Sequence, residues 1–296
     1  MTQSRARAAH ALRHALPQFV FAGLCLSSLD ATAKYLVREH SLLIIVWARY
    51  AGQMLVVTPF AWHRAGGQFW RTGKLRLQLL RSLFLLLATL GFWGGLRYLP
   101  LAEASSITFL APIIVVALSW PMLREHATRA RRIASIAGFA GILILLHPGS
   151  AVMHPAVLLL LGAALSNALY QLLTRRLLDE GAHTTLFYSA SIGTIGLSLF
   201  LPWGIEETEF GLGAIAMLVL LGGLAGLGHW FMTRAYLQAP ASLLSPFTYL
   251  QIIWATAFGY LIFGQHPDAT SALGMAVVIA SGVALALWER RRARLL

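Results

Sequence analysis

Ten long apolar segments follow one another along the chain, and no other feature of the sequence constrains its fold as much. A helix needs about 20 mainly apolar residues to cross a bilayer. The segments are rich in Leu and Ala, and they lack the alternating pattern of a membrane β-strand. Only 11% of the 296 residues are charged, whereas soluble domains carry about 25%. The sequence therefore predicts an all-α polytopic membrane protein with ten transmembrane helices, at residues 17–37, 42–62, 79–99, 104–123, 131–148, 155–177, 184–203, 211–237, 241–263 and 269–288.

The last residues of the third segment reappear in the eighth. Residues 91–99 have the sequence GFWGGLRYL, and residues 228–237 have the sequence GHWFMTRAYL. A unit of five spans crosses the membrane an odd number of times, so its second copy must be upside down relative to the first. Inverted repeats are typical of secondary transporters, whose substrate site lies near the midplane between the halves. We therefore expect two inverted five-helix repeats, residues 1–148 and residues 149–296.

The formal net charge of +12 could indicate a nucleic-acid or anionic partner, but the distribution of the charge favours a topological origin. If the N-terminus is inside, 19 of the 23 Lys and Arg residues lie on the inner side. Lys and Arg collect in the cytoplasmic loops of membrane proteins. We therefore expect no nucleic-acid partner, a multi-pass location in a bacterial-type inner membrane, and both termini in the cytoplasm.

The chemistry of an enzyme or of an ATP-driven pump is missing from the sequence. It contains no P-loop, no GxGxxG between a strand and a helix, and no metal-ligand spacing. The single cysteine, Cys25, excludes an intramolecular disulfide and a cysteine-based metal site. An integral membrane enzyme acting on lipid-linked substrates is the alternative, and only the acidic group Glu206, Glu207 and Glu209 could serve it. We interpret that group as an ordinary outer loop, and we expect neither enzymatic activity nor a cofactor.

Ionisable residues inside a span are expensive, so each one suggests a function. Asp30 and Lys34 are four residues apart and share a helix face, and Arg49 lies at a similar depth in the second span. These residues either fix the packing of the first two helices, or Lys34 and Arg49 supply the positive charge that anchors a substrate carboxylate. His229 is the only histidine well inside a span, where it serves as a hydrogen-bonded structural residue or as a proton-sensitive cavity residue.

Uncharged polar and aromatic residues gather in the middle of several spans. Such faces either hold helices together or line a cavity, and aromatic side chains at mid-depth suit the walls of a pocket for an organic solute. Pro112 and Pro246 could break the fourth and ninth helices, as happens at transporter substrate sites. The predicted solute contacts are Lys34, Arg49, Trp93, Tyr98, Asn167, Tyr170, Tyr188, His229, Trp230, Tyr249 and Trp254.

Residues 97–147 contain a Tyr-Leu-Pro-Leu-Ala-Glu-Ala turn, a proline-bearing helix and an Arg-Glu pair before the next span. This pattern resembles the EamA-type branch of the drug/metabolite transporter superfamily, and residues 245–286 resemble it too. The resemblance implies that the two inverted repeats surround a central cavity. It also implies transport of small organic metabolites, with exporters of amino acids, including aromatic ones, prominent. The sequence departs from the family at Gln265, where the second repeat usually has an acidic residue like Glu125 in the first.

Together these features predict a secondary transporter that exports small metabolites, in particular amino acids, by alternating access. An importer of the same fold is the alternative, because gradients and not the sequence set the direction. The expected partners are the solute and the lipid bilayer, and the chain could be a monomer or a homodimer. Asp30 is the only acidic side chain well inside a span, and it lies close to basic residues. We therefore expect facilitated diffusion or exchange and not proton coupling.

Overall fold

The computed structural model describes residues 2–123, 129–145, 147, 154–177, 179–204, 210–238 and 250–295, and within these ranges the regular structure is helical. Each predicted span contains a described helix, which confirms the predicted all-α membrane fold. Five helices (α1, α2, α3, α7 and α10) are long and apolar enough to cross a membrane. The helices of the first half are α1 (Thr2–Leu36), α2 (Leu42–Ala65), the short 3-10 helix η1 (Gly66–Gln68), α3 (Leu75–Leu96), α4 (Leu101–Thr108), α5 (Ala111–Leu123) and α6 (Arg129–Leu145).

The second half follows the same order of long and short helices. It contains α7 (Val157–Arg175), α8 (Ala182–Ser198), α9 (Leu201–Gly204), α10 (Leu212–Gln238), α12 (Leu250–Phe263) and α13 (Ala269–Leu295). In order along the two halves, α1 corresponds to α7, α2 to α8 and α3 to α10. The α4–α5 pair corresponds to α12, and α6 corresponds to α13.

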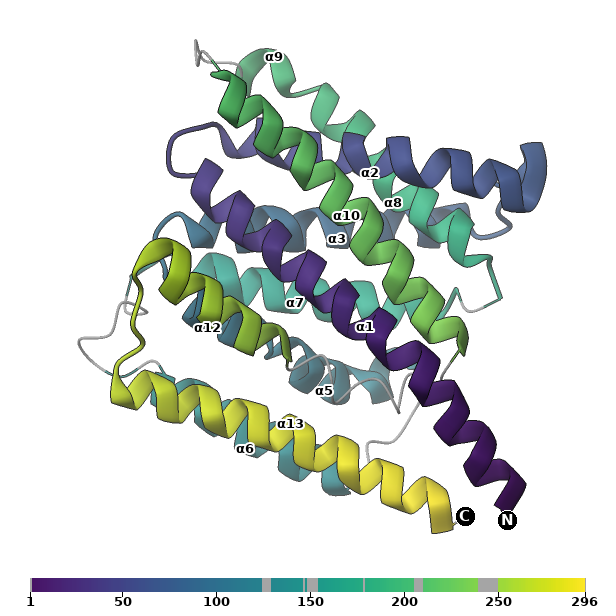
Figure 1. Ribbon diagram of the computed structural model, residues 1–296, viewed down its shortest axis with the longest axis vertical. Helices are drawn as coiled ribbons and strands as arrows, with labels where there is room; N and C mark the ends of the chain where they lie inside the picture. Colours follow the sequence, from purple (N-terminus) through teal and green to yellow (C-terminus); the bar gives the residue numbers. More distant parts are fainter. Residues whose placement is uncertain are drawn as a thin grey trace.

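The packing of the helices has the twofold relation that two repeats require. Helix α1 packs against α10, and α3 packs against α7, which is the same contact with the halves exchanged. The contacts of α2 with α10 and of α3 with α8 form a second such pair. Helices α2 and α8 contact each other, as do α6 and α13, which lie side by side at one edge of the bundle (Figure 1).

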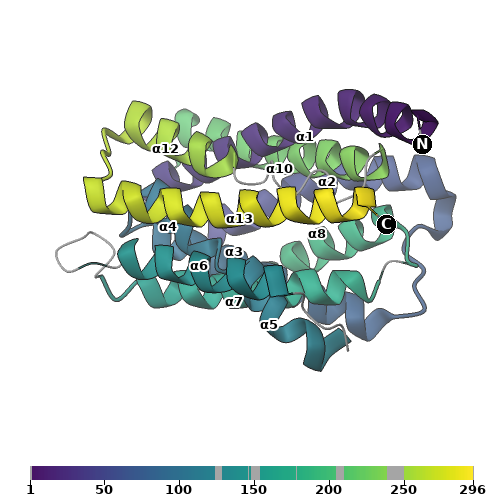
Figure 2. The same ribbon diagram turned by 90° about the horizontal axis from the view of Figure 1, so that it is seen from below.

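Both chain termini lie at the same end of the bundle, as an even number of crossings requires (Figure 2). We call this the terminal end. The opposite end, which we call the far end, carries the turn at residues 97–100 and the connection at residues 264–268. The first helix begins at Thr2, earlier than the predicted residue 17. Residues 2–16 are rich in Ala and Arg, which are strong helix formers, so the helix continues beyond the apolar segment.

Glycines bring helix backbones into direct contact where the helices cross. A Cβ atom on Gly52 of α2 would lie 2.3 Å from the Cα atom of Gly222 in α10. At the edge of the bundle, a Cβ atom on Gly141 of α6 would lie 2.9 Å from the carbonyl oxygen of Gly274 in α13. Any larger residue would push these helices apart, so the glycines fix the separation of the helices around the centre.

The fourth span is broken, and the break lies where Pro112 made a break possible. Helix α4 ends at Thr108, and α5 begins at Ala111. In between, the Leu110 amide donates to the carbonyl of Ile107 at 3.0 Å, a bond of three-residue spacing. Proline has no N–H, so the α-helical ladder cannot run through Pro112 to the preceding turn. The corresponding Pro246 lies outside the described residues.

Candidate functional site

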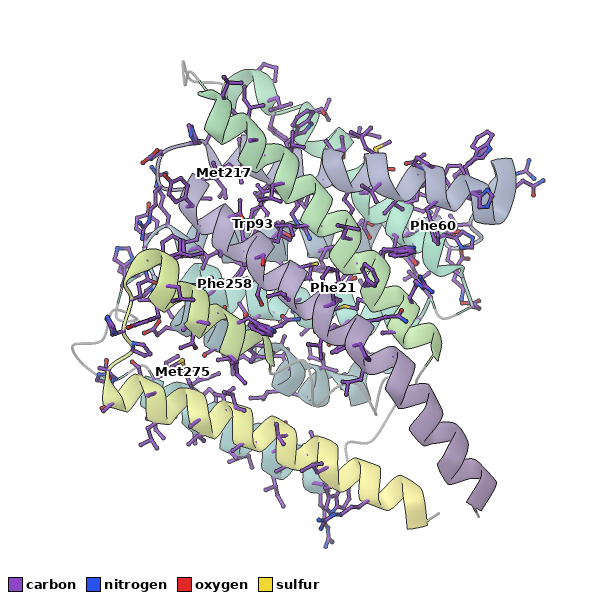
Figure 3. The ribbon with its side chains drawn as sticks, viewed as in Figure 1. Phe21, Phe60, Trp93, Met217, Phe258 and Met275 are labelled. Carbon is purple, nitrogen blue, oxygen red and sulfur yellow. The ribbon has the colours of Figure 1, made fainter. Side chains whose placement is uncertain are left out.

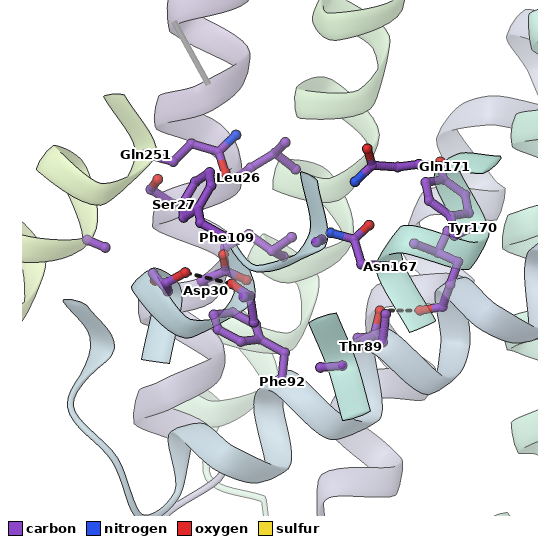
Figure 4. Close-up of a pocket in the computed structure, with 18 of the residues that line it drawn as sticks. Leu26, Ser27, Asp30, Thr89, Phe92, Phe109, Asn167, Tyr170, Gln171 and Gln251 are labelled. Carbon is purple, nitrogen blue, oxygen red and sulfur yellow. Dashed lines mark hydrogen bonds between the residues drawn. The ribbon is translucent and has the colours of Figure 1, made fainter. Parts of the chain in front are cut away.

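A cavity of about 680 Å³ lies at the centre of the bundle, between helices of both halves. Its wall combines aromatic rings with amide, hydroxyl and charged side chains. Figure 4 shows Asn167 and Gln171 of α7 on one side and Ser27 of α1 and Gln251 of α12 on the other. The volume lies within the range of roughly 300–1,000 Å³ that is usual for sites of organic ligands. The polar and aromatic lining residues are Ser27, Asp30, Arg49, Thr89, Phe92, Trp93, Ser105, Thr108, Phe109, Asn167, Tyr170, Gln171, Thr174, His229 and Gln251.

The cavity extends from the middle of the bundle toward the terminal end. Thr174 lines it one residue before α7 ends at Arg175, at the terminal end. Toward the far end, the lining stops at Trp93 near the end of α3 and at Leu101, the first residue of α4. The cavity is therefore deeper on the terminal side than on the far side.

Arg49 of α2 brings a positive charge to the cavity wall. Its side chain is only 5% exposed, and its guanidinium lies over the rings of Tyr50, at 4.4 Å, and Trp93, at 5.6 Å. Nη2 is 3.5 Å from Nε2 of His229. Nε and Nη1 are buried and have no hydrogen-bond partner among the described residues. Buried donors without partners are costly, so Arg49 is well suited to bind an anionic group that enters the cavity.

Asp30 of α1 is the carboxylate of the cavity wall within the described residues. Its Oδ1 accepts a hydrogen bond of 3.0 Å from Nε1 of Trp93, and Trp93 is buried. One indole therefore contacts both Asp30 and Arg49. The cavity presents groups of both charge signs to a solute, together with a flat aromatic surface.

Arg81 of α3 supports the terminal side of the cavity from behind. It donates to Tyr170 Oη at 2.8 Å, to Thr174 Oγ1 at 2.7 Å and to Ser189 Oγ at 2.7 Å, and it lies over the Tyr170 ring. The sequence suggests a loop-edge residue here, but the side chain is buried and ties α3 to α7 and α8. The described residues include no group of three or more His, Cys, Asp or Glu that could hold a metal ion.

Comparison with known proteins places the chain in a family. The profile of the EamA-like transporter family matches residues 15–147 and again residues 154–288. The chain belongs to the EamA-like transporter family. It is 25% identical to an S-adenosylmethionine uptake transporter of Rickettsia prowazekii over 88% of each chain, and 28% identical to a riboflavin transporter of Vibrio cholerae over 96% of each chain.

The fold has a counterpart among solved structures. A crystal structure with a TM-score of 0.67 covers 94% of this chain and 99% of its own at 18% identity. Family and relatives make this EamA-like protein a multi-pass membrane transporter of small molecules and not an enzyme. The acidic group at residues 206, 207 and 209, which an enzyme would have needed, lies outside the described residues.

The structure brings five of the predicted solute contacts to the cavity of this EamA-like protein. These are Arg49, Trp93, Asn167, Tyr170 and His229. Contact with the solute itself remains a prediction. Sequence reasoning did not select Ser27, Phe92, Phe109, Gln171 or Gln251 as contacts. Phe92 could have been found, because it has the place of His229 in the repeated segment.

Lys34 lies away from the cavity, contrary to its expected place beside Arg49. Its Nζ donates to the carbonyl of Leu96 at 2.8 Å and to that of Leu99 at 2.5 Å, where α3 ends. The ring of Phe263 at the end of α12 lies 5.6 Å from the same Nζ. The end of a helix leaves carbonyls without partners, and Lys34 binds two of them. Lys34 thus holds α1, α3 and α12 together at the far end.

The other predicted contacts lie elsewhere. Tyr98 is 55% exposed and stacks on His154 at 4.8 Å, and Tyr188 donates to the carbonyl of Trp70 at 2.7 Å. Trp230 packs against Phe60 and Phe231, and it does not line the cavity, nor does Trp254. Tyr249 lies outside the described residues. Depth in the membrane placed these residues correctly in the middle or at the ends of helices, but it did not show which helix face they occupy.

Proposed function

We propose that this protein moves an amino-acid-bearing metabolite with a flat ring across the inner membrane by alternating access. One observation carries the proposal: Arg49 presents two buried N–H donors without partners at the wall of a central cavity that also contains Asp30 and aromatic rings. A carboxylate of the solute matches Arg49, an ammonium group matches Asp30, and a ring matches Phe92, Trp93 and Phe109.

The relatives support a solute of this kind. S-adenosylmethionine combines an amino-acid head group with a purine, and riboflavin is a flat ring system with a hydroxylated chain. The amides of Asn167, Gln171 and Gln251 along the cavity wall suit the ring nitrogens and hydroxyls of such compounds. Of the two, only S-adenosylmethionine offers the carboxylate that Arg49 is suited to bind. Aromatic amino acids offer a carboxylate and a ring as well, and they fit in the same volume.

The direction of transport follows the gradient of the solute in this proposal. The excess of Lys and Arg at the terminal end supports placing both termini in the cytoplasm. The cavity of the present conformation then faces the cytoplasm, where an exported solute would bind. An uptake carrier would release its solute from the same conformation, and the Rickettsia relative is named for uptake.

Counterflow in proteoliposomes tests the solute class. Vesicles preloaded with tryptophan, S-adenosylmethionine, riboflavin or alanine are diluted into a trace of the same labelled compound. We expect saturable counterflow of tryptophan and S-adenosylmethionine, and we expect alanine to be carried poorly because it has no ring. Counterflow of riboflavin alone would contradict the role of the carboxylate.

Arg49→Gln tests the anion site. A hydrogen bond to a charged group contributes about 1.5–3 kcal/mol, so the affinity for a carboxylate-bearing solute should fall at least about tenfold. Arg71→Gln is the matched control, because Arg71 is exposed outside the cavity. Equal half-saturation concentrations for Arg49→Gln and the control would remove Arg49 from the site.

A pH gradient without a solute gradient tests the energy source. Facilitated diffusion or exchange predicts no net accumulation of solute under this gradient. Uphill accumulation would show proton coupling, and Asp30 would then be the first carboxylate to replace.

A further inference from the structure

The two halves can be aligned residue by residue through their repeated segment. Trp93 and Trp230 are 137 residues apart (230 minus 93), as are Gly91 and Gly228. The structure supports the same offset on the facing helices. A Cβ atom on Gly91 would lie 3.2 Å from the Cβ atom of Ala163 in α7, and one on Gly228 would lie 3.0 Å from Cδ2 of Leu26 in α1. Leu26 and Ala163 are also 137 residues apart (163 minus 26), so the offset holds for α1 and α7.

One helical turn beyond Leu26 and Ala163, the same offset relates Asp30 to Asn167. Trp93 donates to Asp30 in the first half, so the counterpart of this bond in the second half is a bond from Trp230 to Asn167. That bond is absent. Trp230 Nε1 is buried without a hydrogen-bond partner among the described residues, and Asn167 lines the cavity instead.

The two tryptophans lie in different surroundings. Trp93 lies in the middle of the bundle, whereas Phe60, which contacts the Trp230 ring at 6.0 Å, lies toward the terminal end of α2 (Figure 3). Helix α1 packs against α3 around the Trp93–Asp30 bond, and the described parts of α7 and α10 show no comparable contact. The bond is thus made on the far side, where the cavity is shallow, and is missing on the terminal side, where it is deep.

We propose that the two pairs are alternating latches of the transport cycle. In the present conformation the Trp93–Asp30 bond holds α1 to α3 and keeps the far end shut. When the halves exchange conformations, this bond breaks, and Trp230 donates to Asn167 and holds α10 to α7 at the terminal end. Trp93 and Trp230 are therefore positioning residues, each acting through the acceptor on its facing helix.

The two latches differ in strength because their acceptors differ. A hydrogen bond to a carboxylate is roughly twice as strong as one between neutral groups. The Trp93–Asp30 latch thus outweighs the Trp230–Asn167 latch, and the resting protein favours the conformation with the deep terminal side. Asn167→Asp equalises the two acceptors and shifts the population toward the opposite conformation.

Cysteine labelling measures this balance without any solute, so its outcome is independent of the proposed solute class. In a Cys25→Ala background, one reporter cysteine replaces Leu99, which is 1% exposed at the far end. A second reporter, in a separate protein, replaces Gln171 on the terminal side of the cavity. In detergent micelles, the rate of reaction of a polar maleimide with each reporter follows the population that exposes it.

The two indole N–H groups are removed separately by Trp93→Phe and Trp230→Phe, which keep an aromatic ring at each position. Trp93→Phe should raise labelling at position 99 about tenfold, and Trp230→Phe should lower it about fivefold, since a hydrogen bond of each kind is lost from opposite conformations. Asn167→Asp should raise it about tenfold. Trp254→Phe is the matched control and should change it less than twofold, because Trp254 Nε1 is also buried without a partner among the described residues.

The opposite signs separate a latch from a merely structural role. Loss of packing could raise labelling at position 99, but it could not lower it. If Trp93→Phe and Trp230→Phe change labelling in the same direction, or if neither differs from Trp254→Phe, the proposal is overturned. The reporter at position 171 provides the second measurement, and its labelling should slow in Asn167→Asp.

Discussion

Residues 91–99 and residues 228–237 are copies of one segment, and they end α3 and α10 at opposite ends of the bundle. The first glycine of each copy packs against a helix of the other half, Gly91 against α7 and Gly228 against α1. Two residues further on, the copies diverge. Trp93 binds Asp30, and Trp230 has no hydrogen-bond partner among the described residues.

The copies also end differently. Helix α3 stops at Leu96, and the carbonyls of its last turn are bound by Lys34. Helix α10 continues through its copy to Gln238. The shared glycine keeps the helix crossing in both halves, while the residues beyond it take up two arrangements. The difference teaches that a carrier built from repeats can store its two conformations as two environments of one segment.

The largest expected effect comes from replacing Lys34 and its counterpart, Gln171, which lies 137 residues further on. Lys34→Met removes two charge-assisted hydrogen bonds and leaves the carbonyls of Leu96 and Leu99 buried, so we expect a loss of about 3 kcal/mol in the free energy of unfolding. Gln171 is exposed to the cavity, and Gln171→Met should cost less than about 0.5 kcal/mol. Thermal unfolding in detergent compares the two, and equal shifts in Tm would contradict the far-end role of Lys34.

Replacing the two shared glycines tests whether the helix crossings are equally tight. A Cβ atom on Gly91 would lie 2.8 Å from the carbonyl oxygen of Leu159, a backbone atom that cannot move alone. A Cβ atom on Gly228 would meet the end of the Leu26 side chain, which can turn away. We expect Gly91→Ala to cost about 2 kcal/mol and Gly228→Ala less than about 1 kcal/mol. The ranking of the two Tm values checks this, and the reverse order would show that the α1–α10 crossing is the tighter one.

The divergence between Phe92 and His229 can be removed by making the second copy like the first. His229→Phe takes away the ring nitrogen that lies 3.5 Å from Nη2 of Arg49. The guanidinium is then held less firmly, and the half-saturation concentration for a carboxylate-bearing solute should rise about fivefold, as for the loss of a hydrogen bond of about 1 kcal/mol. Counterflow in proteoliposomes measures it, with the exposed His63→Phe as control. An unchanged value would mean that Arg49 is positioned by the Tyr50 and Trp93 rings alone.

The fold and half of the site could be predicted from the sequence, because they depend on patterns along single helices. Apolar length gave the spans, and the repeated segment gave the two halves. The rarity of charge inside a span led to Arg49, and the spacing of Asn167 and Tyr170 placed both on one face of α7, where both line the cavity.

The remaining site residues depend on contacts between helices, which no pattern along one helix contains. Lys34 has the same depth and charge type as Arg49, and only the fold shows that the carbonyls at the end of α3 lie within its reach. Trp230 repeats Trp93 in sequence, but the packing at its own end of the bundle differs. Arg81 lies at the edge of a basic loop in the sequence, and the fold surrounds it with hydroxyl groups from α7 and α8.

The smallest expected effect concerns a surface ion pair that joins the two halves near the second copy. Nζ of Lys74, before α3, is 2.7 Å from Oδ1 of Asp179, before α8. This hydrogen bond, together with a backbone N–H, holds the pKa of Asp179 below its ordinary value of 3.8. A lowered pKa in the folded state stabilises the protein above pH 3.8, and this contribution is lost as the pH falls through the folded pKa.

Asp179→Asn should therefore lower the Tm slightly at pH 7, and the difference from the unchanged protein should vanish near pH 3. Both side chains are exposed, so salt screens the pair, and 0.5 M NaCl should reduce the difference at pH 7 as well. The pair links loops outside the cavity, so labelling at position 99 should not change. A change there as large as that of Trp230→Phe would mean that the loops between the halves, and not the tryptophan pairs, decide which end of the bundle is shut.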